Sequence, residues 1–454
     1  MAPTDTAATP WPAGPVDQDA LQRLLDDRAV TDIMLAVPDM QGRLVGKLFN
    51  ASVFFERMTG GAEMCSYLLA TDVDMRPIQG FDITGWDQGF GDFLVFPDLA
   101  NVRMLPHRPG TALVFGTPLH DDDTAVDVAP RFMLATQLER LHKLGYRVRA
   151  GVESEFVLYT GGPTGLEPVW SGSLDYGLTP PPEVVDFFRD LGGALRDTGI
   201  TYEALKTEGA SGQCEVTFAY RDALAASDDY TVFRHFVGEI ADRHGMTAVF
   251  MAAPETSIGS GLHLHLSLWN EHDEPGFAHY RGEEMPPVMT HATAGLLSAL
   301  PHMTPLFAPT VNSYKRFQPH SFAPTRFNWG FDHRGCAIRV TGHDEGVRLE
   351  VRLAGADANV YLALAAYTAA MAHGIEEKLP RRLVACDGDA YEERASGVPL
   401  YRDLAEALAY FEHSTIAERV LGKNVVRHYA HAAQAELDWH RRQVTDLERQ
   451  RGIR

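Results

Sequence analysis

Four segments of the sequence carry chemically active side chains, three of them at alternate positions, as a β-strand displays them on one face. In GVESEFVLY, a period of two places Glu153 and Glu155 on one face and mainly apolar side chains on the other. In LHLHLSL, the residues between the leucines are His263, His265 and Ser267. A single strand of this kind is usually only a sheet with one solvated face. Its recurrence therefore needs an explanation.

The other two segments repeat the pattern with acidic and basic residues. VRLEVRL displays Arg348, Glu350 and Arg352 on one face, and EGASGQCE places Glu208 and Glu215 on either side of a turn-forming GASG. A merely solvated face would also contain Lys, Thr and Gln. These four faces carry almost only Glu, His and Arg, so we expect them to converge on one site.

Convergence of these residues predicts bound metal ions. Five carboxylates in one cavity would repel one another strongly unless divalent cations lay between them. Five carboxylates with one or two imidazoles form a hard, oxygen-dominated ligand set, which favours Mg²⁺ or Mn²⁺ over Zn²⁺. A zinc hydrolase is the competing interpretation, but the sequence has no HExxH motif and no three-histidine cluster.

Several arginines lie close in the sequence to the segments that carry the predicted metal ligands. Arg316, Arg334 and Arg339 precede the arginines of VRLEVRL. Metal ions on one side and guanidinium groups on the other are typical of phosphoryl transfer, although a single arginine more often forms a surface ion pair. A P-loop is excluded, because GRLVGK is one residue short of that motif and lacks the Ser or Thr after the lysine.

The elements that must position these residues fall into two groups. Strand patterns at Asp32–Ala36 and Leu44–Phe49 begin a small β-rich domain, and a helix starting at Pro130 and ending near Gly145 opens a larger one. The C-terminal part is predicted to be helical, most clearly at 404–411 and 432–447. We expect a disordered tail over 1–18, an N-terminal domain over 19–120 and a catalytic domain over 125–454.

Bulk composition excludes several classes of protein. The formal charge of −21 argues against nucleic acid and anionic membranes as partners. The longest apolar run, Val360–Ala372, is better interpreted as a buried helix than as a membrane span. The first 19 residues have neither the basic start nor the apolar core of a signal peptide. Cysteines without a disulfide pattern predict a reducing compartment, of which the cytoplasm is the simplest. The four cysteines are far apart and predict neither a disulfide framework nor a zinc knuckle: Cys65, Cys214, Cys336 and Cys386.

The sequence resembles the type I glutamine synthetase superfamily over nearly its whole length. The motifs GVESEF, EGASGQCE, GSGLHLHLSL, APTVNSYKRFQP, RGCAIRV, RLEVR and NVYLAL occur in the family's order and spacing. PDMQGRLVGK and GDFLVFPDL resemble its N-terminal β-grasp domain. The resemblance implies an α+β fold, in which a small β-grasp domain precedes a large catalytic domain whose antiparallel sheet lines an active-site funnel.

The resemblance also implies roles for single residues. One metal ion would be held by Glu155, Glu208 and Glu215, and a second, nearer the ATP phosphates, by Glu153, His263 and Glu350. Glutamate would be bound by Arg316, Arg352 and the backbone at Gly259, and the transferring phosphoryl group by Arg334. The nucleotide side would comprise His265, Ser267, Arg339 and Arg348.

The departures from the family lie where ammonium would bind. The family has a glutamate just before Ala-Pro in the flap, where RFQPHSFAP has Phe322, and Ile258 replaces an asparagine. The family's Asp-Gly-Ser-Ser segment is also missing. These differences are typical of the γ-glutamyl-amine ligases, which use ethanolamine, polyamines or other organic amines. A protonated amine still needs a base, for which the candidates are His320, Ser321, Asp72 and Asp74.

The resemblance implies a reaction, an assembly and two alternatives. The γ-carboxylate of glutamate would attack ATP, with two or three Mg²⁺ or Mn²⁺ ions, and an amine would displace the resulting γ-glutamyl phosphate. The chain would form two stacked hexameric rings with active sites shared between subunits. One alternative is an authentic glutamine synthetase with an unusual flap. In that case the flap has shifted its register, and Phe322 is a packing residue with no role in binding an amine. A catalytically silent structural or regulatory paralogue is the other.

Overall fold

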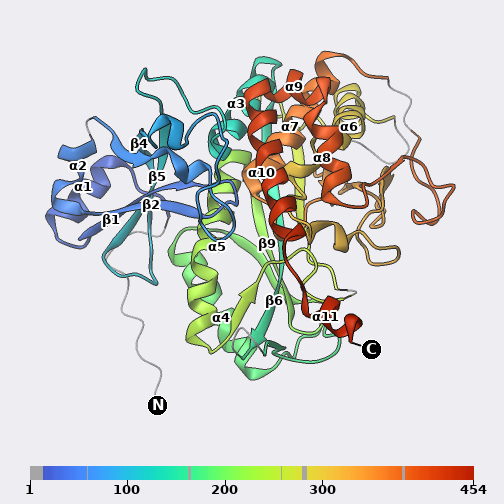
Figure 1. Cartoon of the computed structure of the whole chain (residues 1–454), viewed down its shortest axis with the longest axis horizontal. Coiled ribbons are helices and arrows are strands. Elements are labelled where there is room, and N and C mark those ends of the chain that lie inside the picture. The colour runs from blue at the N-terminus through green and yellow to red at the C-terminus, as the bar shows by residue number, and fades with distance from the viewer. Residues whose placement is uncertain are drawn as a thin grey trace.

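The computed structural model describes residues 14–453, apart from 59, 162–164, 257, 279–283 and 381–383. These residues form two main sheets, one of five strands near the N-terminus and one of nine strands in the larger remainder. Figure 1 shows the smaller sheet beside the helix-rich part, with α10 running between them. The mixed α and β architecture predicted from the sequence is confirmed.

The N-terminal sheet has the strand order β2-β1-β5-β4-β3. β1 pairs in parallel with β5, and the other pairs are antiparallel. β1 and β5 each contain a run of consecutive buried residues, 35–38 and 112–116, so they are covered on both faces and give this part a core of its own. The elements are α1 (Gln18–Asp26), β1 (Asp32–Pro38), β2 (Leu44–Asn50), α2 (Ala51–Met58), β3 (Ala62–Cys65), η1 (Ser66–Leu69), η2 (Trp86–Gln88), β4 (Asp92–Met104) and β5 (Thr111–Leu119).

The segment predicted to be a disordered tail is only partly described. Residues 1–13 lie outside the described residues. Val16 is buried and exchanges backbone hydrogen bonds with Val102 at 2.9 and 3.1 Å. Asp17 then caps α1 by accepting a hydrogen bond from the backbone of Ala20. The fold therefore holds the last residues of this segment in place, before the predicted boundary at residue 18.

The larger part continues as helices and strands in alternation and ends in helices. Its strands are β6 (Arg147–Thr160), β7 (Glu167–Pro168), β8 (Tyr202–Thr207), β9 (Gln213–Asp222), β10 (Thr247–Val249), β11 (Leu262–Trp269), β12 (Arg326–Phe327), β13 (Trp329–Phe331), β14 (Ile338–Thr341), β15 (Arg348–Val351) and β16 (Val398–Pro399). Its helices are α3 (Pro130–Lys143), α4 (Pro182–Asp197), α5 (Ala223–Arg243), α6 (Pro287–Ala299), η3 (Leu300–Leu306), η4 (Ser313–Arg316), α7 (Val360–Glu376), α8 (Leu404–Glu412), α9 (Thr415–Leu421), α10 (Lys423–Arg441) and α11 (Asp446–Gly452).

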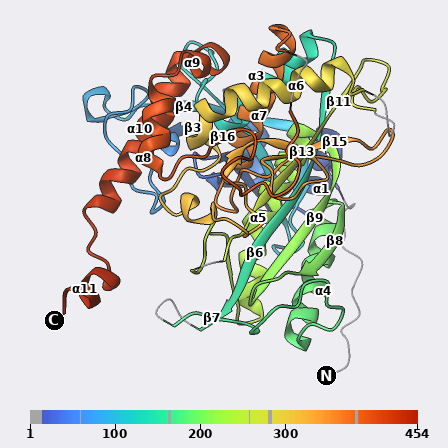
Figure 2. The same ribbon diagram turned by 90° about the vertical axis from the view of Figure 1, so that its right-hand side faces the viewer.

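The large sheet brings together the segments singled out in the sequence. Its order is β13-β14-β15-β11-β6-β9-β8, with β7 and β10 paired to β6. The long strands β6 and β9 run side by side in Figure 2. The leucines of β11 are fully buried and face the core, so its histidines must point to the opposite face: Leu262, Leu264, Leu266 and Leu268.

Two helix predictions have different outcomes. Val360–Ala372 lies within the buried helix α7, as predicted. The helix predicted over Ala432–Leu447 is interrupted, because α10 ends at Arg441 and α11 starts at Asp446. Thr445 forms a capping box with Glu448 that starts the new helix. None of the described helices is both long and apolar enough to cross a bilayer.

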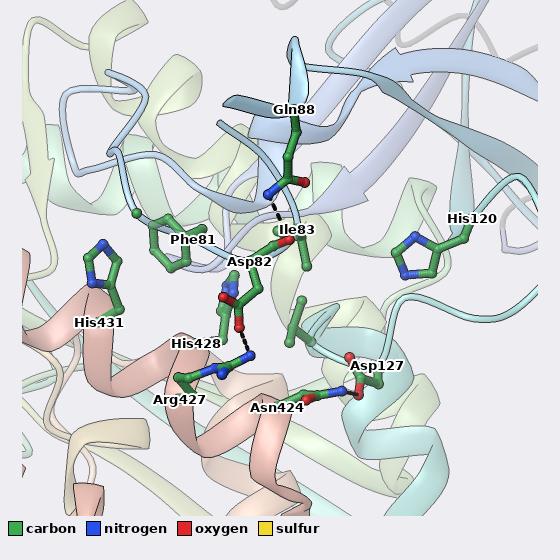
Figure 3. Close-up of a pocket in the computed structure, with 12 residues that line it drawn as sticks. Phe81, Asp82, Ile83, Gln88, His120, Asp127, Asn424, Arg427, His428 and His431 are labelled. Atoms are coloured by element: carbon green, nitrogen blue, oxygen red, sulfur yellow. Dashed lines mark hydrogen bonds and ion pairs between the residues drawn. The ribbon is translucent and has the colours of Figure 1, made fainter. Parts of the chain in front are cut away.

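The N-terminal part packs against α10 around a cavity of about 560 Å³ (Figure 3). Asp82 forms an ion pair with Arg427 of α10 across this junction, and Phe81 packs on His428 with ring centroids 4.4 Å apart. His431 contacts the backbone oxygen of Gln79 at 2.7 Å. These contacts fix the N-terminal sheet relative to the C-terminal helices.

Candidate active site

Strand register places the predicted metal ligands next to one another. Glu153 of β6 pairs with His263 of β11, and His265 pairs with Glu350 of β15. Glu155 pairs with Glu215 of β9. Directly opposed residues have Cβ atoms only about 5 Å apart. The predicted convergence of the four segments is therefore present in the structure.

The side chains form three overlapping groups, in each of which ligand atoms lie within 4.8 Å of one another. One consists of three carboxylates, which come from β6, from β9 and from the turn after β8. The other two combine carboxylates with one imidazole each. The groups are Glu155, Glu208 and Glu215; Glu153, Glu215 and His263; and Glu153, His265 and Glu350.

Glu153 lies at the centre of a polar network. Its carboxylate is 3.3 Å from Nδ1 of His263 and 2.9 Å from Nε2 of His265. Nε of Arg348 donates to Nδ1 of His265 at 3.1 Å, so Nε2 of that ring carries the proton and donates to Glu153. Burial works to raise the pKa of Glu153, but the bonds from the two histidines outweigh it and hold the pKa well below its usual range.

The carboxylates nearer β9 are protonated more readily. Burial, followed by repulsion from Glu153, Glu155 and Glu208, raises the pKa of Glu215 to about 8. Burial and the charge of Glu155 also raise the pKa of Glu208, although Lys206 forms an ion pair with it. Crowded, buried carboxylates of this kind are relieved by a divalent cation. Their donor atoms therefore fit the hard metal ion predicted from the sequence.

Two arginines hold Glu350, whose side chain is fully buried. Arg339 donates to it at 2.7 Å, and Arg352 forms a second ion pair with it. Burial raises the pKa of this carboxyl, but Arg352 and the neighbouring histidines overcome that effect and lower it. Arg339 also pairs with Asp332, so its guanidinium lies beside the metal groups.

Arg316 occupies a different environment from the other arginines. It is buried, and its guanidinium donates to the backbone oxygens of Arg352 and Leu353 at 3.2 Å. The chain beside it is held to the metal groups, because Gly261 donates to Glu155 at 2.7 Å. The carbonyl of Gly259 accepts from Gln213 at 2.9 Å. The residues predicted to bind glutamate therefore border the carboxylates of β6.

A cavity of about 400 Å³ continues the same face of the sheet beyond Glu153. His265, Ser267 and Arg348 line it, as predicted for the nucleotide side, whereas Arg339 is not among its lining residues. Three further lining residues, which were not predicted from the sequence, form an aromatic and cationic wall: Arg149, Tyr220 and Trp269.

The three residues of this wall contact one another. Tyr220 and Trp269 stack with ring centroids 6.5 Å apart, and the guanidinium of Arg149 lies 4.0 Å from the Trp269 ring. The alternation of side chains along a strand could have identified two residues of this wall from the sequence. Trp269 follows Ser267 on the histidine face of β11, and Arg149 precedes Glu153 by four residues on β6. Tyr220 lies within an irregularity in the pairing of β6 with β9, which obscures the pattern.

The flap residues line a separate cavity of about 460 Å³. Phe322 is 68% exposed and has a φ of 59°, as does His320. His320 packs on Tyr391 with ring centroids 4.9 Å apart, and Arg352 donates to the Phe322 backbone oxygen at 3.3 Å. Arg334 lines the same cavity. The residues predicted to contact the amine and the residue predicted to stabilise the phosphoryl group therefore line the same cavity.

The four candidate bases lie in different places. His320 lines the flap cavity. Ser321 donates its hydroxyl proton to Gln318 at 2.6 Å, so it stabilises the loop. Asp72 and Asp74 line another cavity beside α10. Within one chain, only His320 borders the same cavity as Phe322.

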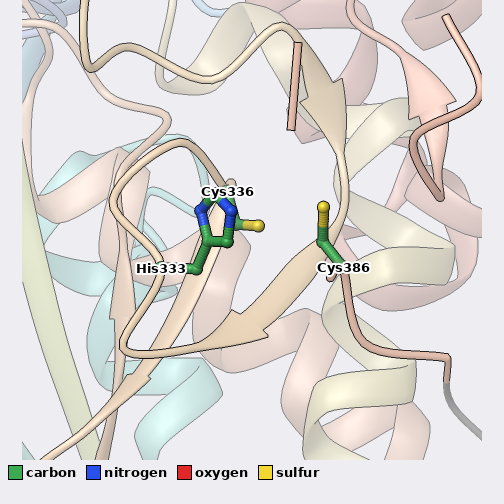
Figure 4. Close-up of side chains that lie close together, drawn as sticks. All are labelled: His333, Cys336 and Cys386. Atoms are coloured by element: carbon green, nitrogen blue, oxygen red, sulfur yellow. The ribbon is translucent and has the colours of Figure 1, made fainter. Parts of the chain in front are cut away.

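Two cysteines that are distant in the sequence meet beside this flap (Figure 4). Cys336 and Cys386 are buried together and are free thiols, with His333 beside them. Burial and the neighbouring thiol raise the pKa of Cys336. Both ring nitrogens of His333 already contact backbone atoms, at 2.7 Å to Gly388 and 3.1 Å to Gly335. Sequence spacing could not reveal this pair, because only the fold brings it together.

Comparison with known proteins identifies relatives along nearly the whole chain. The family model described as glutamine synthetase, catalytic domain, matches residues 127–452. The chain is 40% identical over 448 residues to the gamma-glutamylethanolamide synthetase of Streptomyces coelicolor, covering 97% of this chain and 96% of that one. It is 31% identical to the glutamate–isopropylamine ligase of a Pseudomonas species, covering 89% and 91% of the two chains. A solved complex of GmaS with ADP superposes with a TM-score of 0.83 at 26% identity, covering 95% and 99%.

Proposed function

The chain belongs to the glutamine synthetase family and is an enzyme of the ligase class, and we propose that it forms a γ-glutamyl amide from L-glutamate and a small organic amine. Enzymes of this family use ATP and divalent metal ions. We propose Mg²⁺ or Mn²⁺ as the ion, at two or three positions in each active site.

The carboxylate groups would hold the ions in two sets. Glu155, Glu208 and Glu215 would hold one ion. The second set keeps the predicted ligands Glu153, His263 and Glu350, since Nδ1 of His263 is 3.3 Å from Glu153 and 3.9 Å from Glu350. Ions bound by these residues would supply positive charge that neutralises the phosphates.

The arginines would act on the substrates. Arg352 and Arg316, with the backbone at Gly259, would bind and orient glutamate so that its γ-carboxylate faces the phosphates. Arg334 would stabilise the phosphoryl group during its transfer to that carboxylate. The resulting acyl phosphate contains the leaving group that a free carboxylate lacks, and an amine displaces it. His265, Ser267 and Arg348 would contact the nucleotide on the other side of Glu153.

The observation that carries the amine proposal is the exposed ring of Phe322 in the flap cavity. Phe322, Phe331 and Tyr391 line that cavity together with His320 and Asp332. Aromatic side chains cannot accept the proton of ammonium, but they bind an alkyl chain and attract an organic ammonium group. The carboxylate of Asp332 is paired with Arg339. His320 is the proposed base, because it lines the cavity and holds a ring nitrogen that can accept a proton.

The relatives support an organic amine as acceptor. Their names describe ligation of glutamate to ethanolamine and to isopropylamine. Both amines are small and carry an alkyl portion that an aromatic wall can cover. The apolar wall at Phe322 is the feature of this chain that fits them.

The test is ADP release with glutamate, ATP and Mg²⁺ held constant while the amine is varied. We expect ethanolamine or isopropylamine to be used at least about tenfold better than ammonium, as differential burial of two or three carbon atoms allows. Phe322→Glu should raise the rate with ammonium relative to the organic amine. Phe322→Leu is the matched control, since it keeps an apolar side chain at the same positive φ.

Two results would favour the alternatives. Strong turnover with ammonium and none with organic amines would identify a glutamine synthetase with an altered flap. No turnover and no binding of Mg²⁺ with ATP would identify a silent paralogue. Retention of every predicted metal-ligand position argues against the latter.

We also propose that the chain works in the cytoplasm as a homo-oligomer of two hexameric rings with shared active sites. Asp72 and Asp74 support the sharing, because in one chain they line a cavity different from the one at Phe322. In a ring, a neighbouring chain could present them at that cavity. Size measurement in solution tests the assembly.

A further inference from the structure

A second cluster of metal-ligating side chains lies away from the active site. His107 belongs to the turn between β4 and β5, and His235 and Glu239 belong to α5. One ring nitrogen of each histidine and one carboxylate oxygen of Glu239 lie within 4.8 Å of one another. Nε2 of His107 is 3.8 Å from Glu239. None of these residues lines the cavities described above.

The two imidazoles lack the partners that buried polar groups normally have. The His107 side chain is 1% exposed, and neither of its ring nitrogens has a hydrogen-bond partner in the described part of the chain. Nε2 of His235 is likewise buried without a partner. An unpaired buried donor or acceptor is unfavourable, and a bound ion or water molecule is one way of satisfying it. Two of them in one cluster point to the same missing ligand.

The geometry of α5 supports this interpretation. His235 and Glu239 are four residues apart, so they lie on one face of the helix. His107 approaches that face from the N-terminal sheet, where its ring packs on Phe236 with centroids 5.1 Å apart. The Glu239 side chain is 32% exposed, which leaves the cluster a side open to solvent. An ion could therefore enter beside Glu239.

The protonation of the cluster suits a cation despite two nearby arginines. Burial lowers the pKa of His107 to about 4 and also lowers that of His235, so both rings are neutral near pH 7 and each offers a lone pair. Arg108 donates to Glu239 at 3.2 Å and by a second contact, which keeps that carboxylate ionised and oriented. Arg243 donates to the His107 backbone oxygen at 2.9 Å.

We propose that His107, His235 and Glu239 form a binding site for a transition-metal ion such as Zn²⁺. Two imidazoles and one carboxylate are borderline ligands that select zinc, cobalt or nickel over magnesium. The active-site groups hold at most one imidazole with two carboxylates and favour the harder ions. A bound ion would tie the turn after β4 to α5 and stabilise the junction between the two sheets.

The experiment measures zinc bound to the full chain in excess Mg²⁺, which saturates the carboxylate groups. We expect about one zinc ion per chain in the wild type and a rise of several degrees in its thermal midpoint. His107→Gln should lose both effects and keep its Mg²⁺-dependent activity. The matched control is His302→Gln, because His302 is also a histidine with a buried, unpartnered ring nitrogen but belongs to no such cluster.

A second cluster variant and the absorption spectrum of bound Co²⁺ test the site independently of whether His107→Gln folds. If His107→Gln fails to fold, Glu239→Gln at the partly exposed position carries the same expectation. Visible absorption of Co²⁺ should show a low-coordinate nitrogen and oxygen site in the wild type and in His302→Gln only. Equal zinc binding and equal thermal shifts in the wild type and in either cluster variant would overturn the proposal, whichever substrate the enzyme uses.

Discussion

Replacing Gly261 with alanine tests whether the metal and glutamate residues need their observed positions. A Cβ atom at this position would lie 2.6 Å from Nε2 of His263 and 2.8 Å from a terminal nitrogen of Arg316. Ordinary contact begins at 3.4 Å, so the imidazole would have to move by roughly 0.8 Å. Gly261 does not have a positive φ, so its backbone accepts alanine without strain.

The expected consequence is a catalytic defect in a folded protein. A misplacement of about 1 Å in a positioned group can lower the rate about 100-fold, or about 2.7 kcal/mol. We therefore expect kcat/KM for glutamate to fall by about that factor in an ADP-release assay. The thermal midpoint should stay within about 3 °C of the wild type.

Gly209→Ala is the matched control. Gly209 follows Glu208, and a Cβ there would meet nothing within 4 Å. This variant should keep its activity within about twofold of the wild type. If folded Gly261→Ala were equally active, His263 and Arg316 would not need the positions seen in the structure, and the assignment of both residues would be refuted.

Four further predictions follow from particular contacts. Arg334→Ala should lower kcat about 10³-fold in the same assay with little change in KM for glutamate, and an unchanged kcat would exclude a role in phosphoryl transfer. Trp269→Ala should raise KM for ATP about tenfold, and that for glutamate little, because the stacked wall is lost; equal changes in both constants would contradict the nucleotide assignment. Burial lowers the pKa of His428 from 6.5 to about 3, so the unfolded chain takes up its proton first, and stability should fall as pH drops from 6.5, by about 2 kcal/mol at pH 5; urea unfolding of His428→Asn should show a weaker pH dependence. Arg103→Met should lower the free energy of unfolding by about 2–3 kcal/mol, because the buried carboxylate of Asp229 loses its 2.5 Å partner and keeps only Arg221, at 2.7 Å; an unchanged urea midpoint would contradict this.

Much of the candidate site could be predicted from local pattern alone. The alternation in LHLHLSL identified the buried leucines and the polar histidine face of β11. The same period placed Glu153 and Glu155 on one face of β6. These predictions succeeded because a strand's period of two is set by its own backbone. The motif order also pointed to the family, whose model matches residues 127–452.

Local pattern was less reliable where a few polar residues end an element. The C-terminal composition predicted one helix over 432–447, although Thr445 and Glu448 start a new one. Pro130 and Gly145 bounded α3 as expected. A proline or glycine restricts the backbone strongly, whereas a cap depends on a side-chain hydrogen bond that competes with continuing the helix.

The sequence by itself determined which side chains share a strand face, but not how they group: the structure places His263 with Glu153 and Glu215, and His265 with Glu153 and Glu350. Only the tertiary structure decided that Cys336 meets Cys386, that His107 reaches α5, and that Asp72 lies away from Phe322 in one chain. Such neighbours come from segments far apart in the sequence. Their proximity is set by how whole sheets and helices pack, and no local period of the chain records that packing.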